Sequence, residues 1–326
     1  MNKKALIVIS ILFTLIFYMG CPIDEDIIES PYIHGLTLDN YPNVDGSTST
    51  DPLNVLIACK LLGIKHQWKM SGNGWFIEPV LKSNNNIKKF EQLIRSSQTH
   101  GSILNLIDKK ADIILSARTM SPEEKDYADS NGIVLIETPI ALDAFIFLIN
   151  PNNPITSLTI EQIQNIYTGN ITNWNEIGGN DAPIVPFIRN QNSGSQELMD
   201  SLVMDGFNIM NHLPWSDESF YKNHIISSMI PVFDAVWNDK NAICYTVYYF
   251  KENILRDERT VSLAINGIHP NKENIENNTY PLAAEVYVVI RSDLDKSSMA
   301  YKIYEWIQTE KGKEVISESG YISISR

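Results

Sequence analysis

The chain is poor in the residues and motifs that mark several large classes of protein. It has only three cysteines in 326 residues, and none has the spacing of a zinc site. Lys and Arg number 26 against 39 Asp and Glu, a net charge of −13, which argues against binding nucleic acid through its phosphates. The Gly-x-Ser-x-Gly, His-Glu-x-x-His and Gly-x-x-x-x-Gly-Lys motifs are missing, so the common hydrolases and nucleotidases are disfavoured. We expect no metal, no cofactor and no nucleic-acid partner.

The amino terminus has the features of an export signal. Two lysines precede a short apolar run over residues 5–20, which is followed by Cys21 and is too short for a comfortable membrane span. The sequence Tyr-Met-Gly-Cys resembles a bacterial lipobox, although Tyr18 replaces the usual Leu-like residue. We therefore expect a lipoprotein signal peptide at 1–21 with the lipid on Cys21, and an acidic, proline-broken tether at 22–39. The body is then exported and lipid-anchored at the cell envelope; an uncleaved anchor helix is the alternative.

The body alternates apolar runs with helical periodicity, which predicts an α/β fold. The other two cysteines, Cys59 and Cys244, lie in apolar runs and are predicted to be buried free thiols. Two segments containing proline, 138–143 and 279–282, are interpreted as crossings between lobes. The predicted strands are Ile113–Leu115, Ile133–Ile136, Phe145–Ile149 and Val286–Ile290, and the predicted helices are Leu53–Leu62, one opening at Thr159, and Ser297–Ser317. The crossings predict a first lobe at 40–139 and 280–326 and a second lobe at 140–279.

Hydroxyl side chains accumulate before three predicted helices, at residues 45–50, 96–102 and 189–195. One hydroxyl is enough to cap a helix. The free N–H groups and positive dipole end of a helix start favour an anion. Arg189 adds a fork of donors that suits two oxygens of a tetrahedral oxyanion, and Ser116 with Arg118 offers a second hydroxyl and guanidinium. The residues favour an oxyanion site without a metal; ordinary capped helices and polar loops are the alternative.

Several of these stretches resemble landmarks of the phosphate-binding proteins of phosphate ABC transporters. The residues are 45–49, 111–118, 168–174 and 189–195, and they follow in that family's order. Segments 230–245 and 265–282 extend the resemblance over nearly all of the chain from about residue 41. It implies a periplasmic-binding-protein-like fold of type II, in which two α/β lobes close about a hinge on a ligand cleft.

The same resemblance implies which residues hold the anion. Ser116 matches a binding serine, and Arg189 with the Ser-Gly-Ser sequence matches the family's Arg and Ser-Gly-Thr motif. The match at Thr99, His100 and Gly101 is loose, so these three are possible ligands only. The expected phosphate-binding residues are Ser47, Thr48, Ser49, Ser116, Arg118, Arg189, Ser193, Gly194 and Ser195.

Two positions depart from part of the family. Ala117 stands where some members have an Asp that accepts a proton from phosphate and helps to reject sulfate, and Gln191 stands where an acidic partner of the arginine often lies. Other members have the Ser-x-Arg arrangement found here. Phosphate is therefore the leading ligand, with other tetrahedral oxyanions left open.

The resemblance implies a solute-binding protein rather than an enzyme. We expect a monomer that captures phosphate for an ABC permease complex and meets the membrane only through its lipid. A phosphate-sensing or surface-interaction lipoprotein on the same fold is the alternative. A hydrolase is disfavoured because no base lies near the clustered serines in sequence.

Overall fold

The computed structural model describes residues 30–72, 74–210, 225–226 and 229–324. Its centre is an eight-stranded mixed sheet in which β1, β4, β13, β5, β10 and β7 lie side by side, and β11 and β14 also pair with β5. Three further pairs are β2–β3, β6–β12 and β8–β9. The strands are β1 (Val44–Gly46), β2 (His66–Ser71), β3 (Gly74–Pro79), β4 (Ile113–Ser116), β5 (Leu135–Ile149), β6 (Ser157–Leu158), β7 (Val185–Pro186), β8 (Ile188–Arg189), β9 (Ile225–Ile226), β10 (Ala242–Val247), β11 (Val261–Ser262), β12 (Ala264–Ile265), β13 (Ala283–Arg291) and β14 (Ile322–Ser323).

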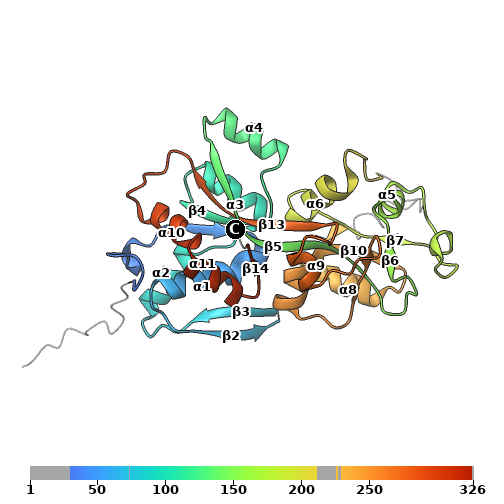
Figure 1. Ribbon diagram of the computed structural model, residues 1–326, viewed down its shortest axis with the longest axis horizontal. Helices are drawn as coiled ribbons and strands as arrows, with labels where there is room; N and C mark the ends of the chain where they lie inside the picture. Colours follow the sequence, from blue (N-terminus) through green and yellow to red (C-terminus); the bar gives the residue numbers. More distant parts are fainter. Residues whose placement is uncertain (1–29, 73, 211–224, 227–228, 325–326) are drawn as a thin grey trace, which may run out of the picture.

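Helices gather around the two ends of this sheet and define two lobes (Figure 1). Around β1 and β4 lie α1 (Asp51–Leu61), α2 (Asn84–Leu93), α3 (Gln98–Ile107), α4 (Pro122–Ser130), α10 (Met299–Ile307) and α11 (Glu310–Glu318). Around β10 and β7 lie α5 (Ile160–Thr168), α6 (Gly194–Leu198), α8 (Pro231–Asn238) and α9 (Lys272–Glu276). The short helices are η1 (Leu38–Asn40), η2 (Thr48–Thr50), η3 (Trp174–Ile177), η4 (Met199–Met204) and η5 (Phe250–Leu255). The predicted two-lobed α/β fold is confirmed.

The strand β5 joins the lobes without interruption. It was predicted as two strands, but it runs for 15 residues, pairing with β13 in its first part and with β10 in its last. Its register with β13 shifts where Pro139 pairs with Tyr287 and Ala141 with Val286, so Ile140 is an extra residue. Proline has no N–H for the ladder and is tolerated at such a bulge. The predicted crossing at 138–143 therefore lies inside a strand, and the lobe borders stay a prediction.

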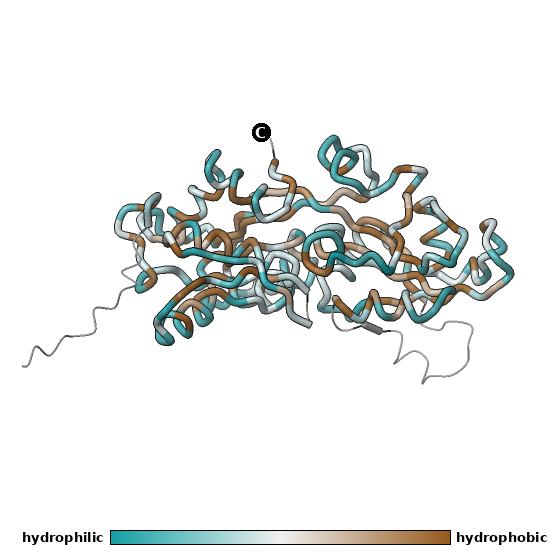
Figure 2. Tube along the Cα trace, turned by 90° about the horizontal axis from the view of Figure 1, so that it is seen from below, coloured by the Kyte–Doolittle hydropathy of each residue, from teal (hydrophilic) through white to brown (hydrophobic). Residues whose placement is uncertain are grey.

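Apolar residues fill the interior along these central strands. Residues 144–149 of β5 are all buried, and Figure 2 shows hydrophobic segments running through the middle of the molecule with hydrophilic ones outside. Cys59 and Cys244 are buried free thiols, as predicted. Burial raises the pKa of each thiol to about 12, so both stay protonated and unreactive at neutral pH.

Two predicted elements differ from the structure. Residues 30–39 are not a tether, because Ile33, Leu36 and Leu38 are buried in the core; the acidic, proline-containing residues before them hid this apolar spacing. The last helix is divided into α10 and α11, since Thr309 accepts a hydrogen bond from Gly312 N–H and begins a new helix. The predicted signal peptide, Cys21 and residues 22–29 lie outside the described residues. Within the described ranges no helix is long and apolar enough to span a bilayer.

Candidate functional site

Ser47 lies at the centre of the polar contacts at the end of two strands. β1 and β4 are parallel, so the residues that follow them meet at one edge of the sheet. Ser47 Oγ accepts a hydrogen bond from Ala117 N–H at 3.0 Å and lies 2.9 Å from Thr99 Oγ1. Two segments separated by 70 and 52 residues from Ser47 are thereby brought to one point.

Asp45 fixes the start of α3 beside this point. Its Oδ1 accepts from Ser97 N–H at 2.8 Å, and its Oδ2 accepts from the Asn105 amide at 2.8 Å. Helix α3 begins at Gln98, before the predicted start, so Thr99, His100 and Gly101 lie in its first turn rather than in a loop. Gln98 has a φ of +64°, a conformation that few residues other than glycine adopt.

The three hydroxyl-rich helix starts do not use their serines as ordinary caps. At η2, α3 and α6 the N-cap residues are Ser47, Ser97 and Ser193, and no side-chain cap hydrogen bond forms at any of them. Elsewhere in the chain the hydroxyl does cap, as Thr159 does for α5 and Ser298 for α10. The capped-helix alternative therefore does not account for these serines, and Ser47 and Ser193 remain at a cavity surface.

The second lobe contributes Arg189 at the end of β8. The side chain is buried, its Nη1 lies 3.4 Å from the Met229 sulfur, and burial lowers the pKa of the guanidinium because the charged form has lost water. Its backbone N–H donates to both Tyr245 OH at 3.0 Å and Gln196 Oε1 at 3.1 Å. An oxyanion bound beside Arg189 would offset the cost of burying this charge.

These parts enclose a cavity of about 140 Å³ between the lobes. From the first lobe come Ser47, Thr48, Ser49, Gln98, Thr99 and Ala117, and from the second come Arg189, Ser193, Gly194, Ser195, Leu198, Met229 and Val247. One guanidinium and several hydroxyls from both lobes face this interlobe cavity. Such a set of donors can hold a small oxyanion without a metal, and within the described ranges no cluster of three His, Cys, Asp or Glu residues could hold a metal ion.

The structure brings most of the predicted residues together. Ser47, Thr48, Ser49, Arg189, Ser193, Gly194, Ser195 and the looser match Thr99 all line the interlobe cavity. Ser116, Arg118, His100 and Gly101 do not line it. The Ser116 hydroxyl donates to the Arg118 carbonyl at 2.6 Å. The role of each residue in binding stays a prediction.

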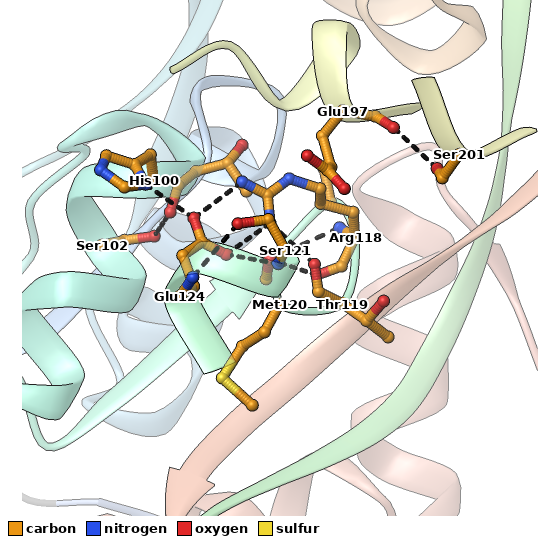
Figure 3. A network of polar contacts seen from close by, with 12 residues as sticks. His100, Ser102, Arg118, Thr119, Met120, Ser121, Glu124, Glu197 and Ser201 are labelled. Atoms are coloured by element: carbon orange, nitrogen blue, oxygen red, sulfur yellow. Dashed lines mark hydrogen bonds and ion pairs between the residues drawn. The ribbon is translucent and has the colours of Figure 1, made fainter. Parts of the chain in front are cut away.

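Arg118 and His100 belong to a separate polar network around Glu124 (Figure 3). The Arg118 guanidinium makes two bonds to the Glu124 carboxylate, at 2.7 and 2.9 Å, and His100 Nδ1 lies 2.8 Å from the same carboxylate. Sequence reasoning missed this network because Glu124 stands in the highly charged segment 122–126, which gives no sign of burial, whereas its side chain is buried. It also missed the cavity-lining Gln98, Leu198, Met229 and Val247. Gln98 stands in the hydroxyl-rich segment 96–102, but none of these four side chains carries a hydroxyl or a charge itself.

Comparisons with known proteins show which proteins the chain is similar to. The model of the PBP superfamily domain matches residues 71–310. The phosphate-binding protein PstS of Borreliella burgdorferi is 26% identical over 263 residues, which cover 78% of this chain and 88% of that protein. PstS of Bacillus subtilis is 22% identical over 204 residues, 62% of each chain.

Two solved structures share the fold. One is a putative phosphate ABC transporter substrate-binding protein with bound phosphate from Clostridium perfringens, with a TM-score of 0.60, 24% identity, and coverage of 86% of this chain and 98% of that chain. The other is an ABC-type phosphate transport receptor from Vibrio cholerae, with a TM-score of 0.60, 22% identity and the same coverage. Because the superfamily model matches residues 71–310, from the end of β2 to the start of α11, and so covers well over half of the chain, this chain belongs to the PBP superfamily.

Proposed function

We propose that the protein captures inorganic phosphate, or a closely related tetrahedral oxyanion, outside the cytoplasm and presents it to an ABC uptake transporter. The observation that carries the proposal is the interlobe cavity, in which buried Arg189 faces serine and threonine hydroxyls from the opposite lobe. A ligand that needs donors from both lobes favours the closed form and shifts the lobes toward it. The names of the PstS relatives support phosphate as the ligand.

The chemistry of the cavity supports binding rather than turnover. Among the described residues that line the cavity there is no His, Asp or Glu. No base therefore stands beside the cavity serines to deprotonate one of them. Capture and release of an anion need only donors that are already in place. Lipid attachment at Cys21 and a monomeric state are part of the proposal and rest on the sequence pattern alone.

Calorimetry tests the proposal with phosphate, arsenate, sulfate and tungstate added to the protein from residue 30 onward. We expect phosphate and arsenate to bind, and Arg189→Gln to weaken phosphate binding by about 100-fold or more, since a buried charged hydrogen bond is lost. Lys240→Gln changes an exposed cation and serves as the control. No heat with any of the four anions overturns the oxyanion site, and sulfate binding as tight as phosphate overturns the preference for phosphate.

A further inference from the structure

Arg118 has one donor that its own lobe does not satisfy. Nη1 and Nη2 bind Glu124, and Nη1 also donates to the Thr119 carbonyl at 2.7 Å. The side chain is 5% exposed, yet Nε–H has no hydrogen-bond partner in the part of the chain that the structure describes. A buried N–H without an acceptor is unfavourable, so a group that supplies one stabilises the arrangement.

Glu197 of the opposite lobe lies on the other side of the same groove. This groove, the α4–α6 groove, has a volume of about 720 Å³ and is lined by Arg118 and Lys125 on one side and by Glu197 and Ser201 on the other. Figure 3 shows Glu197 next to Arg118. The Glu197 carboxylate makes no ion pair or hydrogen bond with any described residue. Among the described residues, the Glu197 carboxylate therefore lacks a hydrogen-bond donor, and the neighbouring Arg118 Nε–H lacks an acceptor.

Arg118 has the largest effect on Glu197 among the charges around it. Partial burial raises the pKa of Glu197, and the positive charge of Arg118 is the next largest influence and lowers it. Asp200, Glu124 and Glu123 act in the opposite direction, but each has a smaller effect than Arg118. The guanidinium therefore attracts Glu197 even though Glu124 already neutralises part of its charge. Lys125 lines the groove on the same side as Arg118.

Glu197 lies on the same short helix as residues that line the interlobe cavity. It lies in α6, three residues after Gly194, and α6 begins with two residues that line the cavity. An anion that draws the start of α6 toward Ser47 therefore carries Glu197 toward Arg118. Gly194 already packs against Thr99 in this structure, so the remaining closure brings the Glu197 carboxylate to the Arg118 Nε–H.

We infer that Arg118 is not a ligand of the anion but one half of a latch, whose buried Nε–H binds the Glu197 carboxylate when the lobes close. The inference rests on the proposed function, because the anion shifts the lobes toward a closed form that the ligand-free protein also populates in part. It gives Arg118 and Glu197 a positioning role: they hold the closed form together from outside the cavity. An interaction that is present only in the closed form slows release and leaves the encounter rate unchanged.

The test compares Glu197→Ala and Glu197→Gln with wild type. Arg118 itself is left intact, because its removal strands the buried Glu124 carboxylate. We expect Glu197→Ala to increase the phosphate release rate 3- to 10-fold in stopped-flow tryptophan fluorescence, with an unchanged association rate and melting temperature. Glu197→Gln keeps an acceptor without the charge, so its release rate should lie between those of wild type and Glu197→Ala. Asp126→Ala removes an exposed carboxylate from α4 and leaves release unchanged.

Small-angle scattering without ligand gives a second reading that does not depend on phosphate. The latch predicts a larger radius of gyration for Glu197→Ala than for wild type. Phosphate binding by wild type with an unchanged release rate in Glu197→Ala overturns the latch and leaves the proposed function standing. If wild type binds no oxyanion, the proposed function fails, and scattering curves that coincide overturn the latch as well.

Discussion

Gly194 of one lobe packs against Thr99 of the other so closely that a Cβ at residue 194 would overlap Thr99 Oγ1 and lie 3.1 Å from Thr99 Cβ. Gly194→Ala should therefore hold the lobes apart at the cavity. Crowding of this kind costs about 1–3 kcal/mol, so we expect a loss of phosphate affinity of roughly 5- to 100-fold by calorimetry.

Two companion variants separate this contact from a general effect of alanine. Gly72→Ala adds a methyl group with no atom within 4 Å and should bind as wild type. Thr99→Ala combined with Gly194→Ala removes the overlapping oxygen and should recover part of the loss. Equal affinity in Gly194→Ala and wild type contradicts closure at this contact.

Tyr245 sets the position of Arg189. Its hydroxyl accepts from the Arg189 backbone N–H and donates to Gln196. Tyr245→Phe should weaken phosphate binding about 3- to 10-fold, because one neutral hydrogen bond contributes about 1 kcal/mol. Tyr167→Phe is the matched control: its ring lies 5.8 Å from that of Tyr245, and its hydroxyl binds the Phe187 carbonyl at 3.2 Å. Equal losses in the two variants would indicate a packing effect.

Asp143, in the middle of β5, makes folding depend on pH. Its Oδ1 accepts from Ala144 and Tyr249 N–H, while Oδ2 is buried without a partner among the described residues. Burial, the largest cause, raises the pKa of Asp143 from 3.8 to about 7. The folded state thus favours the protonated acid, and the stability it contributes is full below about pH 4 and is lost as the pH rises through 7.

Asp143→Asn removes this titration and keeps an acceptor for both N–H groups. Without ligand, the melting temperature of the variant should rise relative to that of wild type as the pH increases from 5 to 8. At the upper end the free energy of unfolding of the variant should exceed that of wild type by up to about 4 kcal/mol. The phenols of Tyr248, Tyr249 and Tyr321 around Asp143 stay protonated throughout, since burial raises the pKa of each. Melting curves that stay parallel across this range contradict the prediction.

Leu36 tests whether residues 30–39 belong to the folded body. The side chain is 0% exposed, so Leu36→Ala leaves a cavity and should lower the free energy of unfolding by about 2–5 kcal/mol in urea. His34→Ala changes an exposed side chain in the same segment and should have little effect. A flexible tether predicts no change in either variant.

The sequence predicts the fold better than the details of the site. Alternating apolar runs and helical periods are local signals, and they place β4, β13, α1 and α5 to within a few residues. The continuity of β5 is not local: Pro139 looks like a break in sequence, and only its pairing with Tyr287 makes it a bulge.

The same distinction applies to the binding residues. Ser47 and Arg189 are found from hydroxyl and charge patterns beside predicted helices. The partner of Arg118 is not, because Glu124 reaches the guanidinium only once α4 has formed and packed beside α3. Met229 has no pattern at all, and only the folding of the second lobe places its sulfur beside Arg189.

The unbroken path of β5 beside β13 limits how the two lobes can move. Nine residue pairs hold the strands in register from Ala283 to Arg291, and a ladder of this kind can bend and twist far more easily than it can slip. Opening is thereby confined to rotation about a ribbon, without translation of one lobe along the other. Each time the lobes close, Thr99 therefore packs against Gly194 in the same way, and the donors of the cavity return to the same positions.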